Sequence, residues 1–354
     1  MAKVIVGMSG GVDSSVAAYL LKESGYDVIG VTLRTWNSGE GSRCCEIDEA
    51  RKAAYILGIP YYALNRVENF RRLVVEPFVG EYVKGFTPNP CIGCNPHVKW
   101  EGMLHAAKIF DADYVATGHY ASVIKKPEGY TLKKALHGEK DQTYMLYRLT
   151  QEQLAATLMP LGGMSKDDVR GIAAEVGIPA ASLPDSQEIC FVTNGSYADY
   201  IEANAGDSLP GEGRFVDEEG NVLGTHKGIT HYTVGQRKGL GLALGSPVYV
   251  KEIRAESNEV VLGKKESLLA SSLICDDVCL MRAESPEPGE EISCEVKIRY
   301  RSAATSGVVK VLPGNRAAVM FREPVSAAAP GQSAVFYDRE DCVVGGGIIR
   351  EVIF

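Results

Sequence analysis

The sequence predicts an α/β protein in which a parallel sheet flanked by helices is followed by β-rich segments. Short apolar runs alternate with helical segments over roughly the first 200 residues, which is typical of strands buried on both faces of a parallel sheet. The first of these runs, residues 4–6, leads directly into a Gly-rich turn and a helix. From residue 203 the chain is rich in Gly, Val and Thr, and turns separate short alternating strands. This spacing favours one or two small β domains, the last of them a barrel.

The individual elements follow from the spacing of apolar residues and from turn signals. In the first part we expect a hairpin at 125–134, strands at 4–6, 27–33, 61–64 and 114–117, and helices at 12–21, 48–57, 67–84, 100–110, 151–158 and 166–176. Pro77 marks a break or kink, and Ser165 is expected to cap the last helix. In the second part we expect strands at 248–253, 260–263, 291–298, 308–311, 317–321 and 334–337.

The turn after the first strand has the composition of a phosphate-binding site. Residues 7–15 read Gly-Met-Ser-Gly-Gly-Val-Asp-Ser-Ser, which combines flexible glycines with three hydroxyl donors. A strand, a Gly-rich turn and a helix N-terminus direct backbone N–H groups at one point. The turn is neither a Walker A loop nor a G-x-G-x-x-G turn. A Gly-Gly pair alone would indicate only an ordinary corner. Because Gly7, Leu33 and Gly118 lie at strand ends, we expect all three to meet at one nucleotide.

Composition limits the classes of function. A chain with 45% apolar and 23% charged residues is expected to be a soluble globular protein with an ample core. No apolar run reaches the length of a membrane span, and the first residues lack a signal-peptide layout, so we expect a cytoplasmic protein. The net charge of −8 gives no support to nucleic-acid binding, since basic residues cluster only locally, near 125–140 and 299–301.

The cysteines indicate thiol or metal chemistry. Nine cysteines at irregular spacing do not resemble a secreted disulfide framework. Cys91 and Cys94 form a C-x-x-C pair, which suits a metal or a redox couple. A zinc site would need two more ligands, and His97 is the candidate nearest in sequence. Cys190 lies between two apolar residues, so it is either a core cysteine or a third reactive thiol.

A series of motifs runs in a fixed order along almost the whole chain. They are S-G-G-V-D-S at 9–14, T-P-N-P-C-I-G-C-N at 87–95, A-T-G-H-Y-A at 116–121, K-D-Q-T-Y at 140–144, D-S-Q-E-I-C-F at 185–191, Y-T-V-G-Q-R-K-G-L-G at 232–241, R-Y-R at 299–301 and P-G-Q at 330–332. With them the sequence resembles the bacterial tRNA-specific 2-thiouridylases, which belong to the PP-loop ATP pyrophosphatases. The resemblance implies a PP-loop catalytic domain at 1–202, a small central domain at 203–267 and a C-terminal β-barrel at 268–354.

The resemblance also implies a reaction. It is the ATP-dependent 2-thiolation of the wobble uridine in tRNAs of the Lys, Glu and Gln type, with Mg²⁺. The uridine O2 is adenylated, a persulfide on Cys190 attacks C2, and Cys94 acts as the second thiol, which leaves a Cys94–Cys190 disulfide. Asp13 is expected to help arrange Mg²⁺ and phosphates, with helix capping as the alternative. The implied ATP-binding residues are Gly7, Met8, Ser9, Gly10, Gly11, Val12, Asp13, Ser14, Leu33 and Gly118.

The partners follow from the same resemblance. The residues implied to lie beside the target base or on the tRNA are Asn89, Pro90, Cys91, His119, Lys140, Asp141, Gln142, Arg299, Tyr300 and Gln332. For His119, a structural role at a strand end is the alternative to a contact with tRNA. The sulfur is expected to come from a cysteine desulfurase, directly or through relay proteins. We expect the chain to act as a monomer.

Three alternatives remain open at this point. Some members of the family carry Asp in place of Cys91, and here the thiols of Cys91, Cys94 and Cys190 could hold a 4Fe–4S cluster with one open iron. Another PP-loop synthetase that uses ammonia would leave these thiols idle, and no glutaminase domain is visible. A non-catalytic, zinc-linked RNA-binding module would bind zinc and turn over no ATP.

Overall fold

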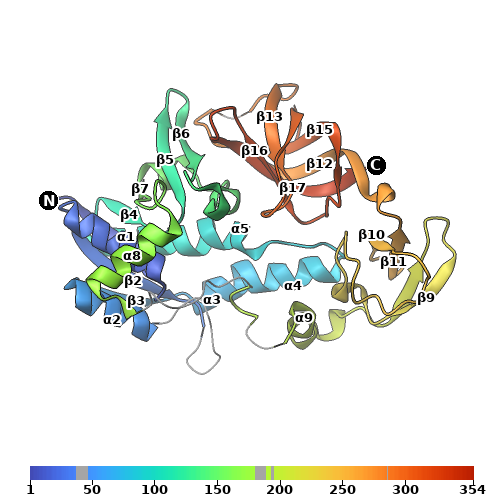
Figure 1. Ribbon diagram of the computed structural model, residues 1–354, viewed down its shortest axis with the longest axis horizontal. Helices are drawn as coiled ribbons and strands as arrows, with labels where there is room; N and C mark the ends of the chain where they lie inside the picture. The colour runs from blue at the N-terminus through green and yellow to red at the C-terminus, as the bar shows by residue number, and fades with distance from the viewer. Residues whose placement is uncertain (37–46, 180–188, 193–194, 285) are drawn as a thin grey trace.

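The computed structural model describes residues 1–36, 47–179, 189–192, 195–284 and 286–354. Figure 1 shows the predicted order of parts: a sheet domain at the N-terminus, a small sheet in the middle of the chain, and a barrel near the C-terminus. Among the described residues, no helix is long and apolar enough to cross a membrane.

The first domain contains a five-stranded sheet in the order β3-β2-β1-β4-β7, and it is parallel, as the sequence predicts. Its strands are β1 (Lys3–Gly7), β2 (Asp27–Arg34), β3 (Tyr61–Asn65), β4 (Tyr114–Ala116) and β7 (Thr157–Leu158). Val4 and Val6 pack with the helices on one face, whereas Ile5 packs on the other, so every residue of the run must be apolar.

Helices cover both faces of this sheet. One face packs against α1 (Val12–Glu23), α2 (Ile47–Leu57) and α8 (Lys166–Val176), and the other against α6 (Glu101–Phe110). Ser165 caps α8 as predicted, because its hydroxyl accepts a hydrogen bond from the Asp168 amide.

Two predicted helices differ from expectation. The segment 67–84 consists of α3 (Val67–Phe70), a π-helical turn at Arg71–Val75 and α4 (Glu76–Val83). The predicted break therefore precedes Pro77, whose ring would clash with the carbonyl of Leu73 in an unbroken α-helix. The helix expected at 151–158 is wrong at its end, because α7 (Gln151–Ala155) stops and the next residues form the edge strand β7, which pairs with β4.

The rest of the chain is β-rich, as predicted. The small sheet has the order β10-β11-β8-β9 and contains β8 (Gly213–Val216), β9 (Val222–His226), β10 (Tyr249–Arg254) and β11 (Glu259–Gly263). The closed barrel has the order β12-β15-β14-β13-β16-β17 and contains β12 (Leu269–Leu280), β13 (Glu291–Lys297), β14 (Thr305–Leu312), β15 (Arg316–Ser326), β16 (Ser333–Tyr337) and β17 (Val343–Ile353). The sequence analysis missed β8, β9, β12 and β17. The domain boundaries at 202 and 267 stay predictions, and the first lies inside α9 (Tyr197–Ala205).

The barrel is docked on the first domain through the predicted hairpin, β5 (Ala121–Lys126) and β6 (Gly129–Lys134). The Thr131 hydroxyl donates to the Val343 carbonyl at 2.6 Å, and Lys126 forms an ion pair with Asp338 at 2.7 Å. A second contact lies at the other side of the barrel, where the Thr87 amide donates to the Pro330 carbonyl at 2.8 Å. The barrel therefore touches both the hairpin and the loop that precedes the C-x-x-C pair.

Candidate functional site

The Gly-rich turn after β1 is held by its own serines. Gly10 has a φ of +85°, which favours glycine, and Gly11 is the N-cap of α1. The Ser9 amide donates to the Ser14 hydroxyl at 3.1 Å, and that hydroxyl donates to the Gly11 carbonyl at 3.2 Å. The turn is thus a compact corner that directs the N-terminus of α1 outward from the carboxyl end of the sheet.

The end of β4 lies directly against this turn. A Cβ atom placed on Gly118 would stand 2.6 Å from the carbonyl carbon of Asp13 and 2.6 Å from the amide nitrogen of Ser14. Only glycine leaves room for this approach. Gly118 therefore sets the distance between the strand end and the first turn of α1.

A cavity of about 230 Å³, open to solvent, lies at these strand ends. Seven of the ten predicted ATP-binding residues line it: Gly7, Met8, Ser9, Asp13, Ser14, Leu33 and Gly118. Gly10, Gly11 and Val12 belong to the same turn but do not line the cavity. His119, Gln142 and Cys94 also line it, so the cavity joins the Gly-rich turn to one thiol of the C-x-x-C pair.

Asp13 is bound to two side chains that the sequence analysis missed. Lys166, at the first position of α8, donates to the two carboxylate oxygens at 2.7 and 2.8 Å, and the Tyr120 hydroxyl donates to one of them at 2.7 Å. The Lys166 side chain is 10% exposed and that of Asp13 is 32% exposed. Asp13 makes no capping hydrogen bond in α1. The sequence contained one signal for Lys166. A lysine at a helix N-terminus is unfavourable beside the helix dipole, so its presence there indicates a negatively charged partner.

The C-x-x-C pair lies on the short helix α5 (Pro90–Cys94). Asn89 caps it, because its side-chain oxygen accepts a hydrogen bond from the Cys91 amide at 3.1 Å. Cys94 is 7% exposed and packs in an apolar cluster with Phe70 and Phe78. The helix continues as a π-helical turn at Asn95–Trp100.

Cys190 is brought to the same place from a distant part of the chain. It packs, half-buried, against the apolar cluster that contains Cys94. Its neighbour Phe191 anchors the segment there, with its ring 5.7 Å from that of Phe70 and 5.2 Å from that of Phe78. The preceding motif residues, 185–188, lie outside the described residues.

Cys91 lies within electrostatic range of Tyr300. Burial raises the pKa of Tyr300, Asp141 and Cys91 raise it further, and Lys140 and Arg301 oppose the shift. The predicted residues Cys91, Lys140 and Asp141 are therefore close enough to Tyr300 to act on it.

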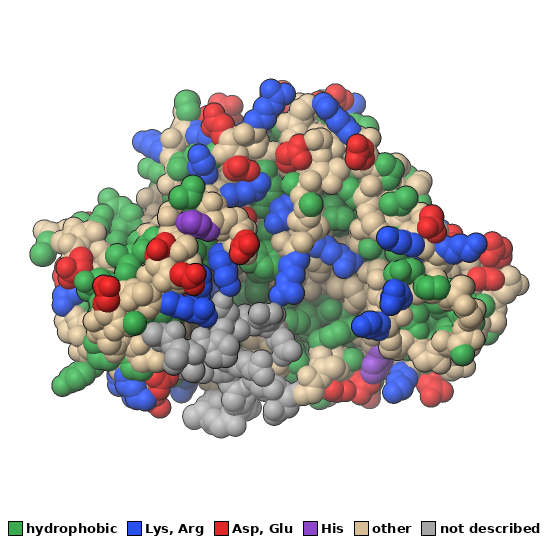
Figure 2. All heavy atoms as spheres, in the orientation of Figure 1, with side chains coloured by type: hydrophobic (Ala, Val, Ile, Leu, Met, Phe, Trp, Pro, Cys, Tyr) green, Lys and Arg blue, Asp and Glu red, His purple; other side chains and the backbone are tan. Residues whose placement is uncertain are grey.

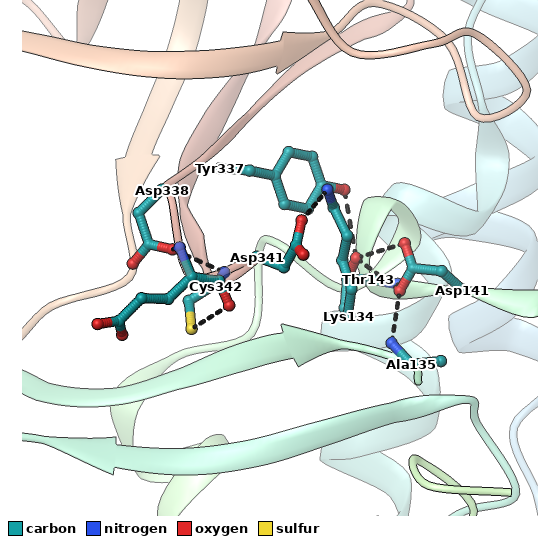
Figure 3. A network of polar contacts seen from close by, with 9 residues as sticks. Lys134, Ala135, Asp141, Thr143, Tyr337, Asp338, Asp341 and Cys342 are labelled. Atoms are coloured by element: carbon teal, nitrogen blue, oxygen red, sulfur yellow. Dashed lines mark hydrogen bonds and ion pairs between the residues drawn. The ribbon is translucent and has the colours of Figure 1, made fainter. Parts of the chain in front are cut away.

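Asp141 and Gln142, two of the residues expected on tRNA, have hydrogen-bond partners within the protein. Asp141 is 5% exposed, and its carboxylate accepts hydrogen bonds from the Thr143 hydroxyl at 2.8 Å and the Ala135 amide at 3.2 Å (Figure 3). Because the Thr143 hydroxyl donates to Asp141, its contact of 3.2 Å with the Tyr337 hydroxyl makes the tyrosine the donor. The Gln142 side-chain oxygen accepts from the Tyr120 amide at 2.9 Å. The predicted contacts of Asp141 and Gln142 with tRNA stay predictions.

The side chains of Arg299 and Gln332 form hydrogen bonds with segments that are distant in the sequence. The Arg299 guanidinium donates to the carbonyls of Val234 and Ala327, each at 2.8 Å, and burial lowers its pKa. The Gln332 amide donates to the Thr87 carbonyl at 2.6 Å. Their predicted contacts with tRNA stay predictions.

His119 has a structural partner. Its Nδ1 lies 2.9 Å from the Thr117 hydroxyl, and its ring lies 5.6 Å from that of Trp100. It nevertheless lines the cavity, so both explanations of this residue remain compatible with the structure.

The zinc alternative finds no support in the described residues. There, the side chains that converge as metal ligands would are Asp338, Glu340 and Cys342, far along the chain from Cys91 and Cys94. The Lys126 ammonium already lies 2.7 Å from Asp338 and 3.3 Å from Glu340.

Fold and site together define a nucleotide-binding α/β domain of the PP-loop class, with the Cys94 thiol at the cavity, in a chain that ends in a β-barrel. Three families match the chain in succession: the tRNA methyl transferase HUP domain at 2–194, the tRNA methyl transferase PRC-barrel domain at 198–264 and the aminomethyltransferase β-barrel domain at 271–349. The chain is 50% identical over 359 residues to the tRNA-specific 2-thiouridylase MnmA of Lachnoclostridium phytofermentans, and the match covers 99% of each chain. It is 47% identical over 360 residues to the protein of that name from Clostridium perfringens, again covering 99% of each. The chain belongs to the MnmA family of tRNA-specific 2-thiouridylases.

A solved structure is also similar, at a lower level. The U34-tRNA thiolase NcsA from Methanococcus maripaludis, with its [4Fe-4S] cluster, is 22% identical and has a TM-score of 0.36, covering 58% of this chain and 67% of that one. A likeness of this size carries no argument about the site.

Proposed function

We propose that this chain is an ATP-dependent tRNA sulfurtransferase that converts the wobble uridine of tRNA to 2-thiouridine. The name of its relatives supports the reaction. The observation that carries the proposal is the cavity, which the Gly-rich turn and Cys94 both line, while Cys190 packs against the same apolar cluster as Cys94. Nucleotide chemistry and thiol chemistry are thereby brought together, as thiolation of a carbonyl carbon requires.

The first step activates the base. The uridine O2 attacks the α-phosphorus of ATP, the bond from that phosphorus to the bridging oxygen breaks, and pyrophosphate leaves with the electron pair. The N3 proton is lost to water. Backbone amides of the Gly-rich turn and the N-terminus of α1 bind the phosphates. Mg²⁺ comes with the nucleotide, held mainly by its phosphates, because both oxygens of Asp13 are already bonded to Lys166.

The second step moves sulfur. The terminal sulfur of a Cys190 persulfide attacks C2, and AMP leaves with the electron pair of the C2–O2 bond. The Cys94 thiolate then attacks the Cys190 sulfur and breaks its bond to the transferred sulfur, which stays on C2 as the product. The resulting Cys94–Cys190 disulfide is reduced by an external thiol. The persulfide itself is supplied by a cysteine desulfurase or a relay protein.

The two-thiol scheme requires only Cys94 and Cys190, which pack in one apolar cluster. Cys91 interacts electrostatically with Tyr300. We place Cys91, with Asn89 and Pro90, beside the target base, as the resemblance implies. A cluster on all three thiols is the alternative that the experiment below distinguishes.

The tRNA would approach between the sheet domain and the barrel. On the face shown in Figure 2, the molecule is hollowed between these two parts, and Lys and Arg side chains surround the hollow. Lys140 and Arg301 act electrostatically on Tyr300, which is half-buried at this contact. These cations offer local phosphate contacts in a chain with a net charge of −8.

The test uses chelator-treated, iron-free protein with an unmodified glutamate or lysine tRNA transcript, ATP, Mg²⁺, cysteine and a cysteine desulfurase. Nucleoside mass spectrometry measures 2-thiouridine. We expect product from the iron-free wild type and none from Cys190→Ser, which should still bind ATP because Cys190 is not among the residues that line the cavity. Product from Cys190→Ser at the wild-type level would refute the assignment. Activity that returns only after anoxic reconstitution of iron and sulfide would assign the thiols to a cluster.

A further inference from the structure

Lys99 is a cavity residue to which the sequence analysis gave no role. It lines the nucleotide cavity together with Ser9, Ser14 and Cys94, and its side chain is half-buried. Among the described residues that line the cavity, it is the only Lys or Arg, and Asp13 is the only carboxylate. Asp13 is bonded to Lys166, whereas Lys99 brings an ammonium group to the same cavity.

An unusual helical turn brings Lys99 to the cavity that Cys94 also lines. In an α-helix, five residues rotate by about 500°, so residues 94 and 99 would point about 140° apart. The stretch Asn95–Trp100 is π-helical, with hydrogen bonds between residues five apart in sequence. The wider turn brings residues five apart closer to one face than an α-helix does, and Cys94, which directly precedes the turn, and Lys99 both line the cavity.

The sequence explains why the turn widens here. Pro96 has no N–H, and in an α-helix its ring would clash with the carbonyl of Ile92. Neighbouring side chains hold the wider turn. The Gln153 side chain donates to the Pro96 carbonyl at 3.0 Å, and the Asn95 side chain donates to the Met145 carbonyl at 2.8 Å. Turns of this kind are frequent at functional sites.

We propose that Lys99 is a catalytic residue that binds the α-phosphate, first in ATP and then in the adenylated uridine. The inference rests on the proposed function. The β- and γ-phosphates leave as pyrophosphate from the Gly-rich turn, whereas the α-phosphate must stay bonded to the uridine O2, next to the sulfur that Cys94 helps release. A cation in the cavity that both the turn and Cys94 line can reach the α-phosphate.

The ammonium group would act in both steps. Negative charge builds on the α-phosphate oxygens when O2 attacks, and AMP carries negative charge away when sulfur displaces it. A fixed cation in a partly dry cavity stabilises both transition states more than it stabilises bound ATP. Its removal should therefore lower the rate more than the affinity for ATP.

The test compares Lys99→Gln, Lys99→Arg and wild type in two assays. The first measures the burst of pyrophosphate with ATP and tRNA in the absence of a sulfur donor, and the second measures 2-thiouridine in the complete reaction. We expect Lys99→Gln to lose about 100-fold or more in the burst rate, with the KM for ATP changed only a few-fold. Lys99→Arg should recover most of the burst, because it keeps the charge.

His97→Gln is the matched control. His97 lies on the same π-helical turn but is exposed and contacts Glu101 at 3.4 Å, so its burst rate should equal that of wild type. A normal burst in Lys99→Gln, with or without loss of thiolation, would overturn the inference. A silent wild type would instead refute the proposed function, so the two failures are distinguishable. Thermal unfolding of each variant separates loss of the charge from loss of the fold.

Discussion

The closest backbone approach in the site makes a sharp prediction for Gly118→Ala. The added Cβ would lie 2.6 Å from two backbone atoms of α1, whereas ordinary contact begins at about 3.4 Å, so the first turn of α1 must move by about 0.8 Å. These atoms belong to Asp13 and Ser14, so neither can rotate away as a side chain could. Overpacking of this kind costs about 1–3 kcal/mol. A displacement near 1 Å at a reacting centre can cost about 100-fold in rate. We expect ATP affinity to fall at least about tenfold and adenylation by more.

The assay is equilibrium binding of ATP, together with the pyrophosphate burst and thermal unfolding. Gly171→Ala is the matched control, because Gly171 lies in α8 with no atom within 4 Å of the added Cβ. It should leave ATP binding unchanged and raise stability by about 0.5–1 kcal/mol, as glycine is unfavourable inside a helix. If Gly118→Ala bound ATP as tightly as Gly171→Ala, the phosphate site would not depend on the contact between β4 and α1, and the reasoning would be wrong.

Two further predictions concern charged groups. Lys166→Met should leave the Asp13 carboxylate facing the nucleotide phosphates without its cation, so we expect ATP affinity to fall about tenfold, as for loss of a charge-assisted hydrogen bond. Isothermal titration with ATP measures this, and an affinity equal to that of Lys166→Arg would contradict it. His226 predicts a pH dependence of stability. Burial lowers its pKa below the ordinary 6.5, so on acidification the unfolded chain binds the proton first. The stability contribution is complete above about pH 6.5 and is lost as the pH falls toward the folded-state pKa. Thermal unfolding is measured between pH 7.5 and 5. On acidification the Tm of His226→Phe should fall less than that of wild type, and an equal fall in Tm would exclude His226 as the cause.

The sequence predicted those parts of the fold whose signals are local. Strand β1 and the turn after it are specified by adjacent residues, and the cap at Ser165 needs only the three that follow. The long barrel strands were missed for a physical reason. Pairing of β12 is shifted by bulges near Ala270 and Asp276, which break the alternation of apolar and polar residues. In β17, three successive glycines imitate a turn, but Gly346 is needed because a Cβ there would lie 2.7 Å from the Tyr147 ring.

The contacts that the site residues make within the chain could not be predicted. The resemblance implies that Asp141 and Gln332 lie on tRNA, which stays a prediction, and the structure adds a partner inside the chain for each. Lys166 was missed because its partner Asp13 is 153 residues away: its position at a helix N-terminus marks it as unusual, but does not identify that partner. For Cys190, in contrast, the motif at 185–191 singled out the residue from the sequence. Its packing against the apolar cluster of Cys94 is visible only in the fold.

The central claim is that Cys94 and Cys190 act as a pair at the nucleotide cavity. The most direct test is a single turnover with persulfidated, iron-free protein in the absence of reductant. The 2-thiouridine is counted by nucleoside mass spectrometry, and the disulfide is counted by peptide mapping under non-reducing conditions. The account predicts one Cys94–Cys190 disulfide for each 2-thiouridine formed. Stoichiometric 2-thiouridine with both cysteines still reduced would contradict it.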